Sequence, residues 1–232
     1  MFDPIELSSI TKDIVCEDNK RKYYRFRAAR FYGGIATADC VGCNLRCRFC
    51  WAWNVVNNPK KFGDLYTPLQ VANKLISIAK KNKYTKLRIS GNEPTICKEH
   101  LIQLLEHIPS DYLFILETNG LLLSYDTAFV KELSRFSNLH VRVSIKGSNE
   151  EEFTLLTGAK GTFFKYQLKA LKQLQEYQIS FHPAAIELID IVRLKNKLKQ
   201  IDASLPSKLE IEPLILYPKI RARLKKHNIE LR

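Results

Sequence analysis

Four of the six cysteines lie close together in the segment CVGCNLRCRFC, at Cys40, Cys43, Cys47 and Cys50. Thiolates at such short spacing suit metal binding better than disulfides when the compartment is reducing. All four could complete a tetrahedral zinc site, although structural zinc sites usually pair two couples of ligands across a longer gap. The last three alone, in C-x3-C-x2-C spacing, suit three irons of a [4Fe–4S] cluster and leave the fourth iron open. Both metals stay open from these residues alone.

Polar residues also follow four further β-rich runs of the sequence. These residues are Ser90-Gly91-Asn92-Glu93-Pro94, Glu117-Thr118-Asn119-Gly120, Ser144-Ile145-Lys146-Gly147 and His182-Pro183. In α/β folds built from parallel strands, ligands bind at the carboxyl ends of the strands. We therefore expect these side chains to converge on one rim and to face the cysteines.

The elements that must position them alternate between strand and helix. Strands are expected at 35–38, 86–90, 112–116, 139–145, 179–182 and 209–212, because β-branched and aromatic residues concentrate there. Apolar residues at helical spacing predict helices around 71–79, 101–108, 129–133 and 168–177, with starts at Thr67-Pro68 and Asp126. This alternation predicts an α/β fold with a parallel sheet that curls into a partial barrel of six βα units. The core is expected at 31–217, after an amino-terminal extension (1–30) and before a short basic tail (218–232).

Composition limits the class of protein. The chain has 232 residues, 45% of them hydrophobic, which suffices for a substantial core. It has no apolar run of roughly 18 residues that could cross a membrane, and its first residues do not resemble a signal peptide. We therefore expect a cytoplasmic protein without a membrane partner. Cys16 and Cys97, far from the cluster, are expected to be buried small hydrophobic residues, and Cys40 a buried bystander.

The chain is strongly basic, with 37 Lys and Arg against 24 Asp and Glu, a formal net charge of +13. Such an excess can attract nucleic acid. The basic pairs are short and scattered, however, so a solvated surface is favoured and nucleic acid is the minority expectation.

The segment Cys43-Asn44-Leu45-Arg46-Cys47-Arg48-Phe49-Cys50 resembles the signature of the radical S-adenosylmethionine (SAM) superfamily, including the aromatic residue before the last cysteine. Ser90-Gly91-Asn92-Glu93-Pro94 resembles the glycine-rich GGEP element of that family, with Asn92 in place of the second glycine. Asn tolerates unusual backbone angles, so the turn is expected to survive. Glu117-Thr118-Asn119-Gly120 and Ser144-Ile145-Lys146-Gly147 resemble segments of radical activating enzymes, the latter with Ser in place of Asp.

The resemblance implies a TIM-like partial barrel, a [4Fe–4S] cluster and SAM as cofactors, and an electron donor such as ferredoxin or flavodoxin as a partner. It assigns the iron ligands to Cys43, Cys47 and Cys50. It implies that SAM contacts come from Phe49, Ser90, Gly91, Asn92, Glu93, Thr118, Asn119, Ser144, Lys146 and His182. No catalytic residue is assigned.

Several other residues keep two interpretations. Trp51 and Trp53 could screen the cluster or stack on a planar substrate. Glu210 and Glu212 share one face of a strand and could point into the barrel or into solvent.

The leading hypothesis is an enzyme that cleaves SAM into methionine and a 5′-deoxyadenosyl radical, which abstracts hydrogen from a small-molecule or protein substrate. The alternatives are an RNA-modifying radical SAM enzyme and a non-enzymatic zinc- or iron–sulfur-binding protein.

Overall fold

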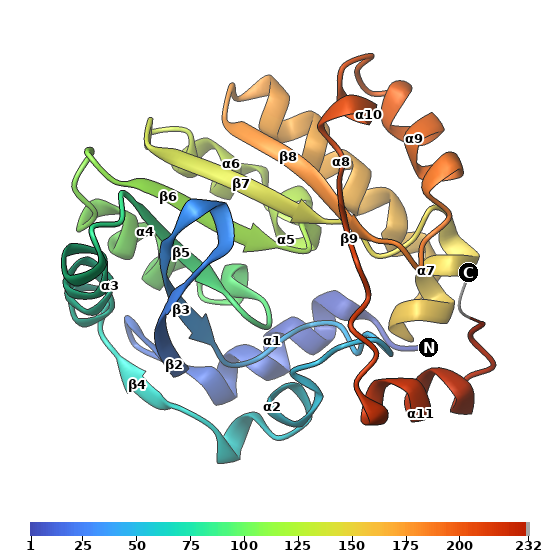
Figure 1. The fold of residues 1–232 in the computed structure, drawn as a ribbon, viewed down its shortest axis with the longest axis horizontal. Helices are drawn as coiled ribbons and strands as arrows, with labels where there is room; N and C mark the ends of the chain where they lie inside the picture. The colour runs from blue at the N-terminus through green and yellow to red at the C-terminus, as the bar shows by residue number, and fades with distance from the viewer. Residues whose placement is uncertain (231–232) are drawn as a thin grey trace.

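Six parallel strands form the centre of the fold and confirm the predicted partial barrel (Figure 1). The computed structural model describes residues 1–230. In sheet order the strands are β3 (Ile35–Cys40), β5 (Lys86–Ser90), β6 (Leu113–Thr118), β7 (Leu139–Ser144), β8 (Ser180–Ile186) and β9 (Glu210–Glu212). Each is hydrogen-bonded in parallel to the next. The predicted strands correspond to these six, within a few residues at their ends.

Three strands that the sequence patterns did not predict extend the sheet on the side of β3. They are β1 (Cys16–Glu17), β2 (Lys20–Ala29) and β4 (Asp64–Tyr66), and both β1 and β4 pair with β2 in antiparallel register. β2 itself pairs antiparallel with β3. Its sequence, KRKYYRFRAA, is rich in basic residues, which hid it from a search for apolar strands. One of these residues, Arg21, is completely buried.

Most helices occupy the connections between strands, whereas the first precedes β1 and the last follows β9. They are α1 (Pro4–Val15), α2 (Trp53–Asn57), α3 (Pro68–Asn82), α4 (Lys98–Glu106), α5 (Leu121–Tyr125), α6 (Thr127–Leu133), α7 (Glu150–Thr157), α8 (Phe164–Glu176), α9 (Ile191–Lys199), α10 (Leu205–Lys208) and α11 (Pro218–Lys226). Short 3-10 turns lie at Phe31–Gly33, Pro59–Lys61, Pro94–Ile96 and Gly161–Phe163. Within the part of the chain that the structure describes, no helix is both long and apolar enough to cross a bilayer.

Two predicted helix starts are confirmed in detail. Thr67 caps α3 through a capping box with Gln70, in which each side chain bonds the backbone N–H of the other residue. Asp126 caps α6 by accepting a hydrogen bond from the N–H of Phe129. The apolar stripe of α3 is buried against the sheet. α3 is therefore fixed both at its capped start and along its apolar face.

The predicted end of the fifth strand is wrong. β8 continues through Pro183 to Ile186. The N–H of Ile145, just after β7, donates to the carbonyl of Ala184. Because neighbouring residues of a strand direct their backbone groups to alternate sides, those of Pro183 face β9. On the side of β8 that faces β9, the first residue to pair is Ala184, with Glu210, so Pro183 has no partner there. The missing N–H of proline is therefore tolerated, and His182 lies within the strand, below the rim.

The expectation for Cys16 and Cys97 is only partly confirmed: Cys97 is buried and Cys16 packs against the same hydrophobic cluster, but the structure joins the two in a disulfide. Cys16 follows α1, and Cys97 follows the 3-10 turn Pro94–Ile96. The two segments are 81 residues apart in sequence and pack together in a small hydrophobic cluster. Spacing along the chain could not reveal this pair, because only the packing of α1 brings the sulfurs together.

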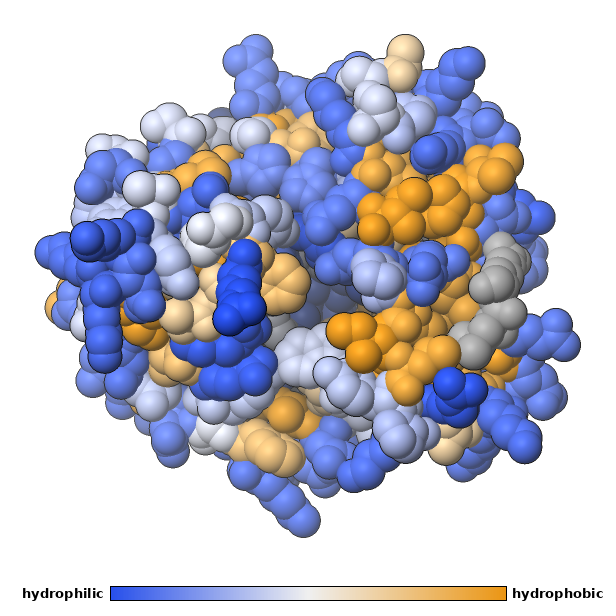
Figure 2. Space-filling model, in the orientation of Figure 1, coloured by the Kyte–Doolittle hydropathy of each residue, from blue (hydrophilic) through white to orange (hydrophobic). Residues whose placement is uncertain are grey.

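The last strand leads into an extended segment and then into α11, which lies beside the amino-terminal half of the fold (Figure 1). Figure 2 shows a hollow near the middle of this face, and hydrophobic residues gather along its rim over β9 and α11. Exposed apolar side chains of this segment include Ile211, Ile215 and Tyr217. The carboxyl-terminal part of the chain therefore borders the opening of the barrel.

Candidate cofactor and active site

One cavity of about 660 Å³ gathers nearly all the residues singled out in the sequence. Its wall includes the three cysteines of the C-x3-C-x2-C motif and nine of the ten residues expected to contact SAM; His182 is absent from it. The lining residues of this predicted set are Cys43, Cys47, Phe49, Cys50, Ser90, Gly91, Asn92, Glu93, Thr118, Asn119, Ser144 and Lys146. Its volume is typical of small-molecule sites, which span about 300–1,000 Å³. The parallel strands thus bring these distant residues together.

The cysteine loop is held from several directions. Gly42 has φ of +91°, and a side chain there would meet Thr11 and Val15 of α1, so only glycine fits this turn. Asn44 is completely buried, and its side-chain oxygen accepts a 2.7 Å hydrogen bond from the amide of Asn119. The loop is therefore fixed both to the amino-terminal helix and to the end of β6.

In this loop Cys47 is buried, Cys43 and Cys50 are partly buried, and none of the three forms a disulfide. Burial raises the pKa of Cys47 to about 12, and it also raises the pKa of Cys43 and Cys50. The positive charges of Lys146 and Arg46 lower the pKa of Cys47 and Cys50, but by less than burial raises it. Thiolates in such a place require a bound cation, and a coordinating metal deprotonates its thiol ligands outright. Three soft sulfur donors on a short loop fit an iron–sulfur cluster.

Among residues 1–230, no three Cys, His, Asp or Glu side chains are arranged to hold one metal ion. A [4Fe–4S] cluster does not need such convergence, because each cysteine binds a different iron. Cys40 stands apart from the loop: its thiol donates to the carbonyl of Gly91 at 2.8 Å, and burial raises its pKa to about 11. It is part of the packing between β3 and the turn after β5.

Asn92 occupies the turn after β5 with φ of +51°, a left-handed conformation that the family element usually gives to glycine. Its side-chain amide donates a 2.6 Å hydrogen bond to the carbonyl of Cys40. This bond fixes the orientation of the amide, so its oxygen faces away from Cys40. That oxygen is buried without a hydrogen-bond partner in the protein, and the residue lines the cavity. An unpartnered acceptor of this kind fits the ammonium group of an amino acid ligand.

Glu93 has no exposed surface, and both of its carboxylate oxygens are engaged. One oxygen accepts hydrogen bonds from the hydroxyls of Thr95 and Thr118, both at 2.6 Å, and the other accepts from the N–H of Asn119 at 2.8 Å. The carboxylate therefore ties the end of β5 to the end of β6. In this structure it positions its neighbours, and the oxygen that faces Asn119 accepts only one hydrogen bond and keeps acceptor capacity for a ligand.

Two buried residues that the sequence did not single out complete this framework. The guanidinium of Arg21 donates to the carbonyls of Val41, Glu93 and Pro94, which joins the cysteine loop to the turn after β5. Gln167 of α8 donates to the carbonyls of Asn119 and Ser144 and accepts from the N–H of Lys146. A polar residue within an otherwise apolar helical stripe was the one signal in the sequence that pointed to Gln167.

Lys146 and Phe49 meet beside the cysteines. The Lys146 ammonium lies 5.6 Å from the centre of the Phe49 ring, and the charge of Lys146 lowers the pKa of Cys47. The hydroxyl of Ser144, next to them on the cavity wall, accepts a 3.0 Å hydrogen bond from Arg142. This corner therefore combines an apolar ring, a cation and a hydroxyl group.

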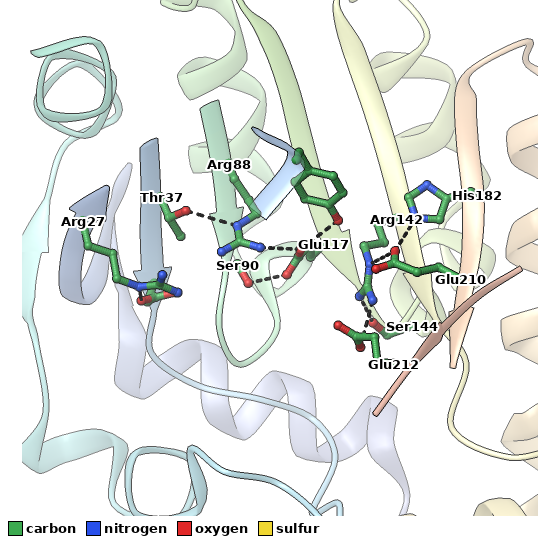
Figure 3. Close-up of polar contacts among 12 residues, drawn as sticks. Arg27, Thr37, Arg88, Ser90, Glu117, Arg142, Ser144, His182, Glu210 and Glu212 are labelled. Carbon is green, nitrogen blue, oxygen red and sulfur yellow. Dashed lines mark hydrogen bonds and ion pairs between the residues drawn. The ribbon is translucent and has the colours of Figure 1, made fainter. Parts of the chain in front are cut away.

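Paired charges line the cavity next to Ser90 and Ser144 (Figure 3). Arg88 contacts Glu117 at 2.8 Å, and Glu117 also accepts from Ser90. Arg142 lies between Glu210 and Glu212, with 2.8 Å to each carboxylate. Both glutamates of β9 therefore face the barrel interior, which decides between the two orientations left open by the sequence.

His182 lies in the middle of β8, where it contacts side chains of the barrel interior. Its Nε2 lies 2.8 Å from Glu210, and its Nδ1 lies 2.7 Å from Nε2 of His140 (Figure 3 shows the contact with Glu210). The hydrogen bond from His182 and the charge of Arg142 hold the pKa of Glu210 at about 2, so this carboxylate is ionised. His182 therefore reaches the cavity only indirectly, through Glu210, which lines it.

The basic carboxyl-terminal segment contacts the cysteine loop from outside. Arg223 of α11 donates to the carbonyl of Arg48 at 2.6 Å and to the carbonyl of Cys50 at 2.5 Å. Its guanidinium also lies 4.3 Å from the centre of the Trp53 ring. Arg223 was not among the predicted site residues, because its position in a basic run gave no sign of a tertiary contact.

Comparison with curated proteins identifies partial relatives. The chain is 29% identical over 168 residues to GTP 3′,8-cyclase of Syntrophomonas wolfei, covering 67% of this chain and 49% of that protein. It is 35% identical over 120 residues to GTP 3′,8-cyclase of Brucella ovis, covering 50% of this chain and 33% of that protein. The chain thus spans half or less of the length of these relatives.

Solved structures share the fold at low sequence identity. Streptococcus suis SuiB bound to precursor peptide SuiA matches 81% of this chain and 42% of its own, with a TM-score of 0.60 and 19% identity. TYW1 with a lysine-pyruvate adduct bound matches 83% and 72%, with a TM-score of 0.56 and 15% identity. The family model of the radical SAM superfamily matches residues 39–186, more than half of the chain. The chain therefore belongs to the radical SAM superfamily, whose enzymes use a [4Fe–4S] cluster and SAM.

Proposed function

We propose that this enzyme cleaves SAM reductively and uses the resulting radical to abstract hydrogen from a small molecule or a peptide segment held in the cavity. One observation carries the proposal: three cysteines and nine residues expected to contact SAM line a single cavity with a second, charged wall. When bound, the cluster supplies one electron that splits SAM into methionine and a 5′-deoxyadenosyl radical.

Each group in the cavity has a proposed task. Cys43, Cys47 and Cys50 ligate the cluster. The free oxygen of Asn92 accepts a hydrogen bond from the methionine ammonium, and Lys146 with Ser144 binds the carboxylate or the ribose. Phe49 packs against the adenine and excludes water. Glu93, itself part of the cavity wall, keeps Thr118 and Asn119 in place.

The charged wall supports a small polar substrate. Arg25 and Arg27 share Asp39, Arg88 pairs with Glu117, and Arg142 is shared by Glu210 and Glu212. Every one of these cationic groups already has an anionic partner, so the wall has no large excess of positive charge. Such a wall suits a ligand with groups of both signs better than a polyanion. Solved neighbours with bound peptide, such as SuiB with SuiA, support the peptide alternative within the same class.

The proposed catalytic core spans 31–217. Arg21 before it and Arg223 after it both contact the cysteine loop or the turn after β5. The last two residues of the basic tail, 231–232, lie outside the described part of the chain.

Anaerobic reconstitution with iron and sulfide, followed by dithionite and SAM, tests the proposal. The expected products are methionine and 5′-deoxyadenosine in equal amounts, at a rate that rises when the substrate is present. Metabolite and peptide fractions can then be screened in deuterated form for transfer of deuterium into 5′-deoxyadenosine. Stoichiometric zinc in place of iron, or an intact cluster that never cleaves SAM, would refute the proposed function.

A further inference from the structure

The outer side of the cysteine loop is covered by a helix that carries only one sign of charge. α11 has the sequence PKIRARLKK, with five basic residues and no acidic one. Ile220 and Leu224 are buried and attach the helix to the protein. Lys219, Arg221, Lys225 and Lys226 are exposed. The helix therefore presents a basic surface to solvent while its apolar side packs inward.

This basic surface is directly connected to the cluster loop. Arg223 bonds the carbonyls of Arg48 and Cys50, and Cys50 is itself only partly buried. Trp51, which follows Cys50, has 58% of its surface exposed. A protein docked against α11 and Trp51 would thus stand over the backbone of a proposed iron ligand. The Trp51 ring, 5.7 Å from the guanidinium of Arg25, would add an aromatic side chain of the kind that protein interfaces commonly have.

The exposed charges of α11 form no salt bridge with the residues that the structure describes, whereas Lys12, Lys98 and Arg135 elsewhere are paired with carboxylates. The pKa of His227 at the end of α11 is lowered by its burial and by the positive charges of Arg48, Lys226 and Arg223. Positive charge is therefore concentrated beside the cysteine loop.

We propose that α11 and Trp51 form the docking surface for an acidic one-electron carrier protein. The inference rests on the proposed function, because reductive cleavage of SAM requires an electron from outside. One electron leaves the carrier, whose flavin goes from hydroquinone to semiquinone, and enters the cluster through this surface. Charge complementarity accelerates such encounters by about 10- to 1,000-fold at low ionic strength.

A matched pair of double charge reversals tests the proposal. Lys225→Glu with Lys226→Glu alters the last turn of α11, and Lys80→Glu with Lys81→Glu makes the same change in the last turn of α3, which lies on the far side of the barrel (Figure 1). The electron donor is a reduced acidic flavodoxin, mixed anaerobically with the reconstituted enzyme. The readouts are the loss of the visible absorbance of the cluster and its electron paramagnetic resonance signal.

We expect the α11 variant to be reduced by flavodoxin at least about tenfold more slowly than the wild type at low salt. The α3 variant should keep the wild-type rate, and dithionite should reduce all three proteins equally. The difference should shrink as salt rises, because the Debye length falls from about 30 Å at 0.01 M to about 10 Å at 0.1 M. Equal flavodoxin rates in the α11 variant and the wild type, or equal slowing by the α3 change, would overturn the proposal.

Two further outcomes are distinguishable. If dithionite reduces the cluster but SAM is never cleaved, the proposed function fails, while the flavodoxin rates still decide the docking surface. If the α11 change abolishes tight binding of a particular RNA and leaves flavodoxin reduction intact, the surface serves nucleic acid and the docking proposal is wrong. Failure to bind a cluster at all overturns both proposals.

Discussion

Replacing Glu93 with glutamine keeps the size of the side chain and removes its charge. The carboxylate is fully buried and accepts four hydrogen bonds, three at one oxygen from Thr95 and Thr118 and one at the other from Asn119. Glutamine can keep the three bonds at its oxygen, but its NH₂ group then faces the N–H of Asn119. Two donors meet where a donor and an acceptor met before.

The expected loss of unfolding free energy is about 2 kcal/mol, since an unsatisfied buried donor costs about 1–3 kcal/mol. Because Asn119 and the turn at Asn92 border the cavity, we also expect SAM to bind about tenfold more weakly, equivalent to about 1.4 kcal/mol. Denaturant unfolding of the metal-free protein and equilibrium binding of SAM to the reconstituted protein measure the two effects.

Thr118→Val supplies the matched control, because it removes one donor to the same carboxylate. If Glu93 acts through this network, Glu93→Gln and Thr118→Val should be non-additive in a double-mutant cycle, since they share a partner. Wild-type stability and SAM affinity in Glu93→Gln, or strict additivity with Thr118→Val, would refute the role assigned to this carboxylate.

The other predictions concern the cluster, the cofactor, the disulfide and pH. Alanine at Cys43, Cys47 or Cys50 should abolish iron binding after anaerobic reconstitution, whereas Cys40→Ala should retain the cluster; iron loss from Cys40→Ala would contradict the assignment. Asn92→Gly should keep the turn, which needs positive φ, but weaken SAM binding by roughly tenfold, because an acceptor worth about 1 kcal/mol is lost; unchanged affinity would remove Asn92 from the site. Reducing the Cys16–Cys97 disulfide, which closes a loop of 81 residues, should lower the unfolding free energy by about 4 kcal/mol, and Cys97→Ser should show no response to reductant. Burial lowers the pKa of His100 from 6.5 to about 4, so the neutral ring stabilises the fold above pH 6.5 and this contribution is lost as pH falls towards 4. The unfolding free energy of the wild type should therefore decrease across that window more steeply than that of His100→Gln, and parallel curves would disprove the assignment.

Local sequence determined the parts of this protein that depend on local chemistry. The short spacing of Cys43, Cys47 and Cys50 indicated a metal held by thiolates, because one loop supplies all three sulfurs, and the resemblance to the radical SAM signature selected the iron–sulfur cluster over zinc. Strand and helix periodicity selected the parallel barrel, since each βα unit must bury one face against the next. In a parallel sheet all strand ends share one edge, so the convergence of Ser90, Thr118 and Ser144 followed from that topology.

Only the tertiary structure decided the contacts that join segments far apart in the chain. Three such contacts could not be predicted from the neighbouring sequence. They are the disulfide of Cys16 with Cys97, the hydrogen bonds of Arg21 to three carbonyls and the contact of Arg223 with the cysteine loop. The same holds for Glu93: the resemblance implied a contact with SAM, and only the fold shows that four protein donors surround the carboxylate. A side chain's type fixes which bonds it can make, but only packing determines which partners come within reach.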